Sequence, residues 1–457
     1  MVGRSHPRVI GLLAAVLSLC AFVGWSASAA PKHHKQPKHH KHHGPRPRPK
    51  PPPPPAGTLD STLGSGGVET VPVGSLAVAA AGAVQADGKI VTVGEATVNG
   101  HNVFVSTRMN RDGSLDSTFG HRGVAIPDPS GEGGGNAVAF QRDGKLLLAG
   151  AARAGNVLSF GVVRLLSNGA IDPTFGHGGV ATVTIGSEAI ANAIAIQPDG
   201  KILLGGTSLN GRLSFTAARL SPDGSVDRSF GSRGVSVIGP AGAAWGMVLQ
   251  PDGRIVLAGE LGNALSYGLL GALSALLPGG GLNSIFQAGD QDMVARLLPN
   301  GAPDSSFGSG GVVTIPYGQA AVALAVALQP DGKIVISGNA FTDRVLALTF
   351  RLLPNGQRDP AFGSRGAVAL EMAQAINALA LQANGSVILA GVGPIVVRLD
   401  GRGRLDPSFG HGGIFRTSLG SGAAANGVTI DRLGKLVLTG AANVAGRTVL
   451  TVMRLNA

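Results

Sequence analysis

The chain has 457 residues, of which 72 are glycine, 19 are aromatic and one is cysteine, and its formal net charge is +11. Hydrophobic residues make up 44% of it and glycine has no period of three, which excludes a collagen-like chain and a chain disordered throughout. A single cysteine excludes a disulfide scaffold.

The first 30 residues have the layout of a secretory signal. Arg4 and Arg8 precede an apolar run from Val9 to Trp25, and Ala27-Ser28-Ala29 fits the small-x-small cleavage rule. We therefore expect a signal peptide over residues 1–29, a secreted, cell-envelope-associated protein and no transmembrane span in the mature chain. An uncleaved anchor is the alternative, because about 17 apolar residues is the lower limit for a membrane-spanning helix.

Residues 30–57 are rich in His, Lys and Pro and predict a disordered linker, here called the tail. Neutral imidazoles bind Zn²⁺ or Ni²⁺, so the tail offers a candidate metal site at His33, His34, His39, His40, His42 and His43. No other cofactor is expected. The tail also carries seven cations and no acid, from which we expect contact with anionic envelope polymers. These cations are Lys32, Lys35, Lys38, Lys41, Arg46, Arg48 and Lys50. A solvated spacer is the third interpretation.

The charge of the rest of the chain is nearly balanced. Of 37 Lys and Arg, nine lie in residues 1–50, which leaves 28 against 26 Asp and Glu. Attraction to polyanions is therefore assigned to the tail, and no specific nucleic-acid partner is expected.

Three motifs recur seven times from Leu59 onward. The first is an aspartate in strings such as LDSTFG, with steps of 56, 56, 55, 77, 55 and 47 residues, at Asp60, Asp116, Asp172, Asp227, Asp304, Asp359 and Asp406. The second is a DGK-type turn that starts at Gln85, Gln141, Gln197, Gln250, Gln329, Gln382 and, in degenerate form, Asp431. The third is an arginine eight residues before the next motif aspartate, and its last copy is Arg454.

Each unit predicts about four strands. In the third unit, AIAIQ at Ala193 and KILLGG at Lys201 flank a tight turn, and strands at Phe215 and Gly234 follow. The prediction is an all-β fold, a seven-bladed β-propeller of about 55-residue four-stranded repeats over residues 58–457, with a β-solenoid as the alternative. The chain ends just where the aspartate motif would come next, which favours a closed ring.

These strings resemble the delta-60 repeat family, whose units pair a glutamine-DGK turn with an aspartate-phenylalanine-glycine segment. The resemblance covers Leu59 to Ala457, with Leu63 in place of the motif phenylalanine. It implies an exported bacterial protein with a propeller-like all-β fold. It implies no enzymatic activity.

The repeated residues are expected to be structural. A motif aspartate can accept backbone N–H groups two or three residues on, and the arginine eight residues earlier can bridge to it. The motif phenylalanines are expected to be buried between blades. A catalytic centre rarely needs seven copies.

The fourth unit contains an insertion over residues 261–289. Asn263 can cap a helix from Ala264 to Leu277 that is too short to span a bilayer. One face of that helix offers candidate partner-binding residues, Leu265, Leu269, Leu273 and Leu276.

No catalytic motif is present, so no catalytic residue is assigned. The favoured function is a binding or scaffold module for a protein or glycan of the cell envelope. The alternative is a lyase or hydrolase acting on envelope polysaccharide with acids from irregular loops, namely Asp128, Glu132, Asp290 and Asp292. A minor alternative is a metal or lyase site at His121, His177 and His411.

Overall fold

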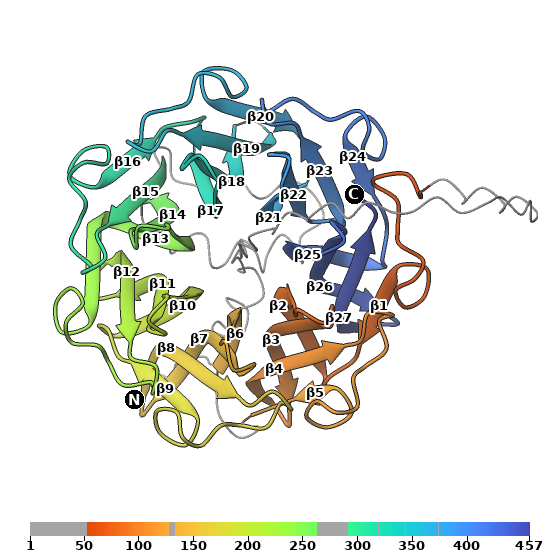
Figure 1. The fold of residues 1–457 in the computed structure, drawn as a ribbon, viewed down its shortest axis with the longest axis horizontal. Coiled ribbons are helices and arrows are strands. Elements are labelled where there is room, and N and C mark those ends of the chain that lie inside the picture. Colours follow the sequence, from red (N-terminus) through yellow and green to blue (C-terminus); the bar gives the residue numbers. More distant parts are fainter. Residues whose placement is uncertain (1–52, 128–132, 263–290, 319, 343, 373) are drawn as a thin grey trace, which may run out of the picture.

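The computed structural model describes residues 53–127, 133–262, 291–318, 320–342, 344–372 and 374–457. Every regular element in these ranges is a β-strand. The sheets stand around a central axis and each presents its strands from the axis outward (Figure 1). The predicted all-β, propeller-like repeat fold is confirmed.

The strand order is the same in successive units. In the first complete unit β2 (Leu76–Val84) is innermost, and β3 (Ile90–Val98), β4 (His101–Met109) and β5 (Val124–Ala125) follow, each antiparallel to the one before. Two further four-stranded sheets repeat this order with β17 (Ala320–Leu328), β18 (Ile334–Phe341), β19 (Val345–Leu352), β20 (Ala367–Glu371), and β21 (Ile376–Leu381), β22 (Val387–Gly391), β23 (Ile395–Leu399), β24 (Ile414–Arg416).

The units between β5 and β17 are joined into one eleven-stranded sheet. It contains β6 (Gly133–Phe140), β7 (Leu146–Ala154), β8 (Val157–Leu165), β9 (Val180–Val183), β10 (Glu188–Ile196), β11 (Ile202–Leu209), β12 (Leu213–Leu220), β13 (Val235–Leu249), β14 (Ile255–Leu261), β15 (Gln291–Leu297) and β16 (Val312–Ile315). The long β13 is the outer strand beside β12 over its first half and the innermost strand beside β14 over its second half. A single residue pair links β8 to β10.

The two ends of the described chain share one sheet. β25 (Ser421–Ile430), β26 (Leu436–Val444) and β27 (Arg447–Leu455) are completed by β1 (Val68–Val71), which pairs antiparallel with β27. Leu59 also bridges to Leu455. The two ends of the repeat region, at Leu59 and Arg454, therefore lie side by side. Contacts of this sheet begin at Gly57, whose N–H donates to the carbonyl of Asn456 (2.7 Å).

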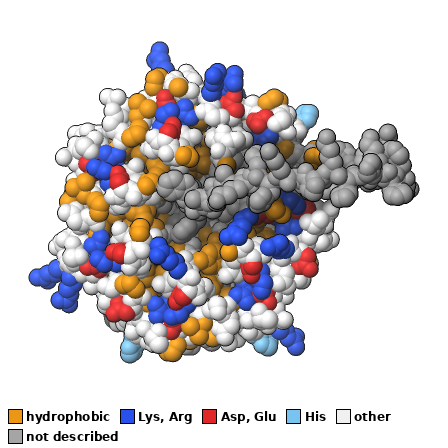
Figure 2. All heavy atoms as spheres, in the orientation of Figure 1, with side chains coloured by type: hydrophobic (Ala, Val, Ile, Leu, Met, Phe, Trp, Pro, Cys, Tyr) orange, Lys and Arg blue, Asp and Glu red, His pale blue; other side chains and the backbone are white. Residues whose placement is uncertain are grey.

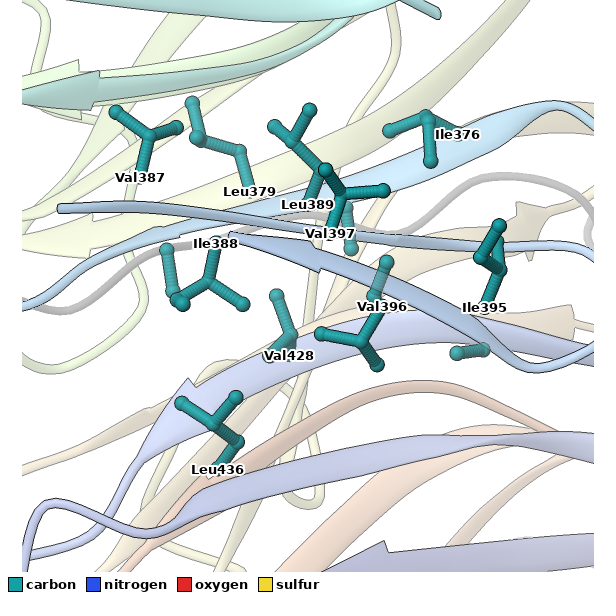
Figure 3. Packing of buried hydrophobic residues seen from close by; sticks show 14 of the residues in the cluster. Ile376, Leu379, Val387, Ile388, Leu389, Ile395, Val396, Val397, Val428 and Leu436 are labelled. Atoms are coloured by element: carbon teal, nitrogen blue, oxygen red, sulfur yellow. The ribbon is translucent and has the colours of Figure 1, made fainter. Parts of the chain in front are cut away.

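The core lies between neighbouring sheets. One cluster combines Leu379, Leu389 and Val397 of the β21–β24 sheet with Val428 and Leu436 of the next sheet (Figure 3). The motif phenylalanines are fully buried, as expected: Phe119, Phe175, Phe230, Phe307, Phe362 and Phe409. Burial of each such ring stabilises the contact between adjacent units.

In each unit, a glycine in the second strand makes room for a β-bulge in the neighbouring innermost strand. In the first unit the bulge falls between Ala79 and Ala81, opposite Gly94. A Cβ on Gly94 would lie 1.9 Å from the carbonyl oxygen of Val78. The same crowding, 1.9–2.1 Å, occurs at Gly150, Gly206, Gly259, Gly338, Gly391 and Gly440.

Gly94→Ala is expected to lower the free energy of unfolding by about 3 kcal/mol, because the added carbon forces two paired strands apart. Gly401→Ala is the control, since its Cβ would meet only one carbonyl oxygen at 3.8 Å. Urea unfolding of both variants measures the difference. Equal midpoints for the two variants would contradict the steric explanation.

Candidate functional site

The three sequence motifs meet in one polar cluster, here called the latch. In the first complete unit Arg108 Nε and Lys89 Nζ each lie 2.7 Å from Asp116 Oδ2. The backbone N–H and hydroxyl of Thr118 donate to Asp116 Oδ1 (3.0 and 2.7 Å). The predicted arginine–aspartate bridge is confirmed. It recurs in the pairs Arg164–Asp172, Arg219–Asp227, Arg296–Asp304, Arg351–Asp359, Arg398–Asp406 and Arg454–Asp60.

Each latch also reaches the following unit. Arg108 Nη1 donates to the carbonyl of Ser167 (2.5 Å), and Gly120 N–H donates to the carbonyl of Asn168 (2.7 Å). The Arg108 guanidinium lies 4.7 Å from the ring centroid of Phe119, a cation–π contact. The latch therefore holds adjacent units together.

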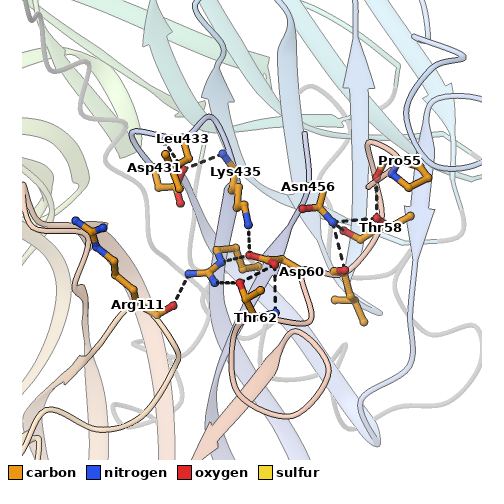
Figure 4. Close-up of polar contacts among 11 residues, drawn as sticks. Pro55, Thr58, Asp60, Thr62, Arg111, Asp431, Leu433, Lys435 and Asn456 are labelled. Carbon is orange, nitrogen blue, oxygen red and sulfur yellow. Dashed lines mark hydrogen bonds and ion pairs between the residues drawn. The ribbon is translucent and has the colours of Figure 1, made fainter. Parts of the chain in front are cut away.

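The last latch joins the two ends of the chain (Figure 4). Arg454 Nε and Lys435 Nζ lie 2.5 Å from Asp60 Oδ2, and Arg454 Nη1 donates to the carbonyl of Arg111 (2.6 Å). Asp60 and Arg454, which are separated by almost the whole described chain, thus form the same latch that an arginine and an aspartate eight residues apart form in the other units.

The latch aspartates are held ionised. Burial raises the pKa of Asp116, but hydrogen bonds from Lys89 and Thr118 and the charge of Arg108 outweigh it and bring that pKa below its usual value. A carboxylate with so low a pKa is a poor acid or base near neutral pH. The latch is structural in every unit.

A second set of polar contacts, which the sequence analysis did not identify, connects the innermost strands. In four of the seven units the residue at the bulge is an asparagine, which donates its side-chain amide to a backbone carbonyl of the next innermost strand. This asparagine belt consists of Asn136 to Ala191 (3.1 Å), Asn192 to Ala244 (2.8 Å), Asn377 to Ala425 (3.4 Å) and Asn426 to Ala79 (3.1 Å). Buried amides of this kind must be satisfied, and here they fix adjacent units in register.

The fourth unit carries unusual residues at two buried positions, Trp245 and Asp292. Trp245 takes the place of the belt asparagine, which the first and fifth units replace with Ala80 and Leu324, and its indole N–H has no partner among the described residues. Asp292 stands directly opposite Glu260 on paired strands β15 and β14, and the two are 2% and 0% exposed. The position of Asp292, four residues before the motif arginine, holds Phe104 and Phe160 in earlier units.

Burial perturbs Asp292. It raises the pKa of Asp292 well above its usual value, with the charge of Arg358 acting in the opposite direction. Glu95, which occupies in β3 the position of Glu260 in β14, has its pKa raised by burial to about 8. Strongly perturbed carboxyl groups at irregular positions are typical of functional sites. We name Glu260, Asp292 and Trp245 the fourth-unit site.

Among the acids named from the sequence, only Asp292 belongs to this site. Asp128, Glu132 and Asp290 lie outside the described residues. So do residues 1–52, with the tail histidines and cations, and the proposed helix with Leu265, Leu269, Leu273 and Leu276.

The three histidines that follow the motif FG pairs are exposed turn residues. His121, His177 and His411 are each one residue past a motif FG pair and are solvent-accessible. Within the described ranges no group of three His, Cys, Asp or Glu side chains could hold a metal ion. No described helix is long and apolar enough to cross a membrane.

A hollow of about 380 Å³ lies between the third-unit motif and the following turn. Ser229, Ser232 and Ser236 line it on one side and Asn300 to Pro303 on the other. The hydroxyl of Ser236 donates to the carbonyl of Gly301 (2.7 Å), so the two turns are fixed to each other.

Four stretches of the chain match the model of a family described as "Domain of unknown function (DUF5122) beta-propeller": residues 85–119, 141–175, 197–230 and 329–362. Each stretch runs from the glutamine of a DGK-type turn to the motif phenylalanine. The matches support a family of propeller repeats, in the same register as the units described above.

Several solved structures are similar in outline. Sqt1 from Chaetomium thermophilum is 12% identical with a TM-score of 0.44, covering 84% of this chain and 97% of that one. YCF48 from Cyanidioschyzon merolae is 12% identical with a TM-score of 0.44, covering 85% and 98%. The C-terminal WD40 domain of Sif2 is 10% identical with a TM-score of 0.37, covering 82% and 81%. The search of curated proteins found no match.

Proposed function

We propose that this chain is an exported, cell-envelope-associated, seven-bladed β-propeller of the delta-60 repeat type that binds a protein or glycan. Seven blades follow if the shared strand β13 is divided between two units and β1 completes the last. The seven latches, one per unit, support this count.

The observation that carries the proposal is the concentration of irregular residues in one unit. The motif residues that recur are engaged in latches and packing, whereas Trp245 and Asp292 break the repeat in the same unit, and Asp292 lies opposite Glu260. Function on a repeat scaffold usually resides where the repeat is broken. The insertion over residues 261–289 connects β14 to β15, the two strands that carry the acids. We propose that a partner binds at this end of the fourth unit, with the four leucines as contacts.

The test uses the full chain and a variant in which Gly262 to Asp290 is replaced by Asn-Gly, the turn that Asn99 and Gly100 form in the first unit. Pull-down from envelope fractions is expected to recover a partner with the wild type only. Equal melting temperatures would show that the fold is kept. Recovery of the same partner by both proteins would reject the site.

The tail is proposed to hold the protein near anionic envelope polymers through its seven Lys and Arg. Capture on envelope fragments is expected to fall as salt rises, and to fall at low salt when residues 31–50 are deleted. Capture that is insensitive to both changes would reject this role. The metal alternative predicts stoichiometric Zn²⁺ or Ni²⁺ uptake that is lost on deletion of residues 31–43.

The enzymatic alternative is favoured by one observation, the raised pKa of Asp292 opposite Glu260. A carboxyl group that stays protonated can act as a general acid on a glycosidic bond. Incubation with purified wall polysaccharide would then release new reducing ends, and Asp292→Asn would abolish the release. Absence of such products with the wild type would exclude this alternative for those substrates.

A further inference from the structure

Nearly all cations of the ring lie at one end of it. We define the motif face as the seven DGK-type turns, the seven segments that connect third to fourth strands, and the motif arginines. From Gly57 onward the sequence has 28 Lys and Arg, and all but Arg153, Arg212, Arg344, Arg416 and Arg447 belong to this face. The face thus holds 23 cations against 16 aspartates, with Glu69 at its border.

Backbone hydrogen bonds join these segments into a continuous rim. The glycine after each motif phenylalanine, or after Leu63 in the first copy, donates to a carbonyl of the following turn, in the pairs Gly64–Asp112, Gly120–Asn168, Gly176–Asp223, Gly231–Asn300, Gly308–Asn355, Gly363–Arg402 and Gly410–Ala56. The seven motif arginines are buried in their latches, and the other 16 of the 23 cations therefore share one surface. Figure 2 shows Lys and Arg side chains spread around the ring rather than gathered in one sector.

Three arginines of this face occupy a conformation that suits glycine. Arg122, Arg233 and Arg365 have φ of 51°, 54° and 52°. The same position in the intervening units is glycine, also with positive φ, at Gly66, Gly178, Gly310 and Gly412. Arginine thus alternates with glycine around the rim.

No contact within the described chain compensates for this backbone strain. All three side chains are exposed and make no hydrogen bond or ion pair with other described residues. A Cβ at the four equivalent glycines would meet no atom within 4 Å, so packing does not call for a side chain here. A strained residue that makes no internal contact indicates a role toward an external group.

We propose that the motif face binds a linear polyanion, with Arg122, Arg233 and Arg365 as its specific contacts. The guanidinium fork suits phosphate, sulfate and carboxylate groups, and neighbouring arginines of the three are at least two units apart, so a small anion could reach only one. A polymer engages all three and gains from multivalency. Beside Arg233, the hollow offers the hydroxyl of Ser232 to one such group, since the hydroxyls of Ser229 and Ser236 donate to Asp227 and Gly301.

The chemistry favours an anionic polysaccharide or polyphosphate over a single-stranded nucleic acid. Proteins that bind single-stranded nucleic acids typically stack the bases on exposed aromatic rings. The large apolar side chains that are exposed in the described chain are Leu or Val, and none is aromatic. This inference rests on the proposed envelope association but assigns the polyanion contact to the ring as well as to the tail.

The test measures binding of polygalacturonate and of inorganic polyphosphate to the full chain at about 50 and 300 mM NaCl. The variant Arg122→Gly/Arg233→Gly/Arg365→Gly is expected to bind at least about tenfold more weakly at low salt. Its melting temperature is expected to equal or exceed that of the wild type, because the substitutions relieve strain. The control Arg212→Ala/Arg416→Ala/Arg447→Ala removes the same charge at the other end and is expected to keep wild-type affinity.

Several outcomes would overturn the proposal. Wild-type affinity in the motif-face variant, or an equal loss in the control, would show that these arginines have no specific role. Stronger binding to single-stranded DNA than to either polymer would assign the face to nucleic acid. A variant with the seven tail cations replaced by Ser separates the contribution of the tail to polymer binding from that of the motif face. Complete loss of binding in that variant would show that only the tail binds the polymer. Failure of envelope pull-down with intact polymer binding would reject the envelope partner and not this face.

Discussion

Asp60→Ala is expected to lower the free energy of unfolding by about 3–5 kcal/mol, one of the largest effects of any single substitution in this chain. The change leaves Arg454 buried, and Lys435 partly buried, without the carboxylate that both contact. Removing one partner of a buried ion pair is costly because an uncompensated charge remains. It also releases the contact between the two ends of the chain.

Asp406→Ala provides the matched control. Asp406 pairs with Arg398, and Ser386 replaces the lysine of its DGK-type turn, so the carboxylate is 23% exposed against 5% for Asp60. We expect a loss of about 1–2 kcal/mol there, because water can solvate the remaining arginine. Denaturant unfolding of both variants decides. An equal loss of unfolding free energy at the two positions would show that the latch between the two chain ends contributes no more to stability than the latch at Asp406.

Glu95→Gln is expected to stabilise the protein above pH 8 and leave it unchanged near pH 4. The pKa of Glu95 is raised from 4.5 to about 8 in the folded state, so unfolding releases a proton between these values. Its contribution to stability is therefore complete below pH 4.5 and is lost as pH rises through about 8. The full loss is on the order of 5 kcal/mol.

The measurement is thermal unfolding of wild type and Glu95→Gln from pH 4 to pH 9. The difference between the two is expected to grow over that range and then level off. The latch aspartates act in the opposite direction at low pH: their lowered pKa values mean that stability is lost as pH falls through those values. A pH-independent difference between the two proteins would contradict the raised pKa.

The sequence was most informative where one residue type recurs at one spacing. The seven aspartates and the arginines eight residues before them predicted their bridge, because the connecting turn brings the two together within one unit. The buried phenylalanines followed from the same register. These features depend on local geometry, which the spacing determines.

The fourth-unit site and the asparagine belt were harder to predict. Glu260 and Asp292 are separated by 31 intervening residues and meet only because β14 and β15 pair in one register. The belt asparagines bond to a neighbouring unit, so their role depends on ring geometry. One signal was present: Trp245 stands where four of the other six units have Asn, and Asp292 stands where three of them have Phe and none has an acid.

The charge of the ring shows the same limit. The count of 28 cations against 26 acids predicted a nearly neutral charge for the repeat region. The structure nevertheless places 23 of those cations on the motif face. Net charge does not report how charges are divided between two faces. Once the turns are known to share one end, the same sequence predicts a basic surface.

The most direct test of the whole account is a disulfide between the first and last strands. Thr70 lies opposite Thr451 in the β1–β27 pair, and such partners are about 4.5–5.5 Å apart, within the range that a disulfide needs. The variant Thr70→Cys/Thr451→Cys is expected to form an intramolecular disulfide on oxidation, seen as a monomer of altered mobility without reductant. Disulfide-linked dimers, or free thiols in a folded monomer, would contradict a ring closed by its two ends.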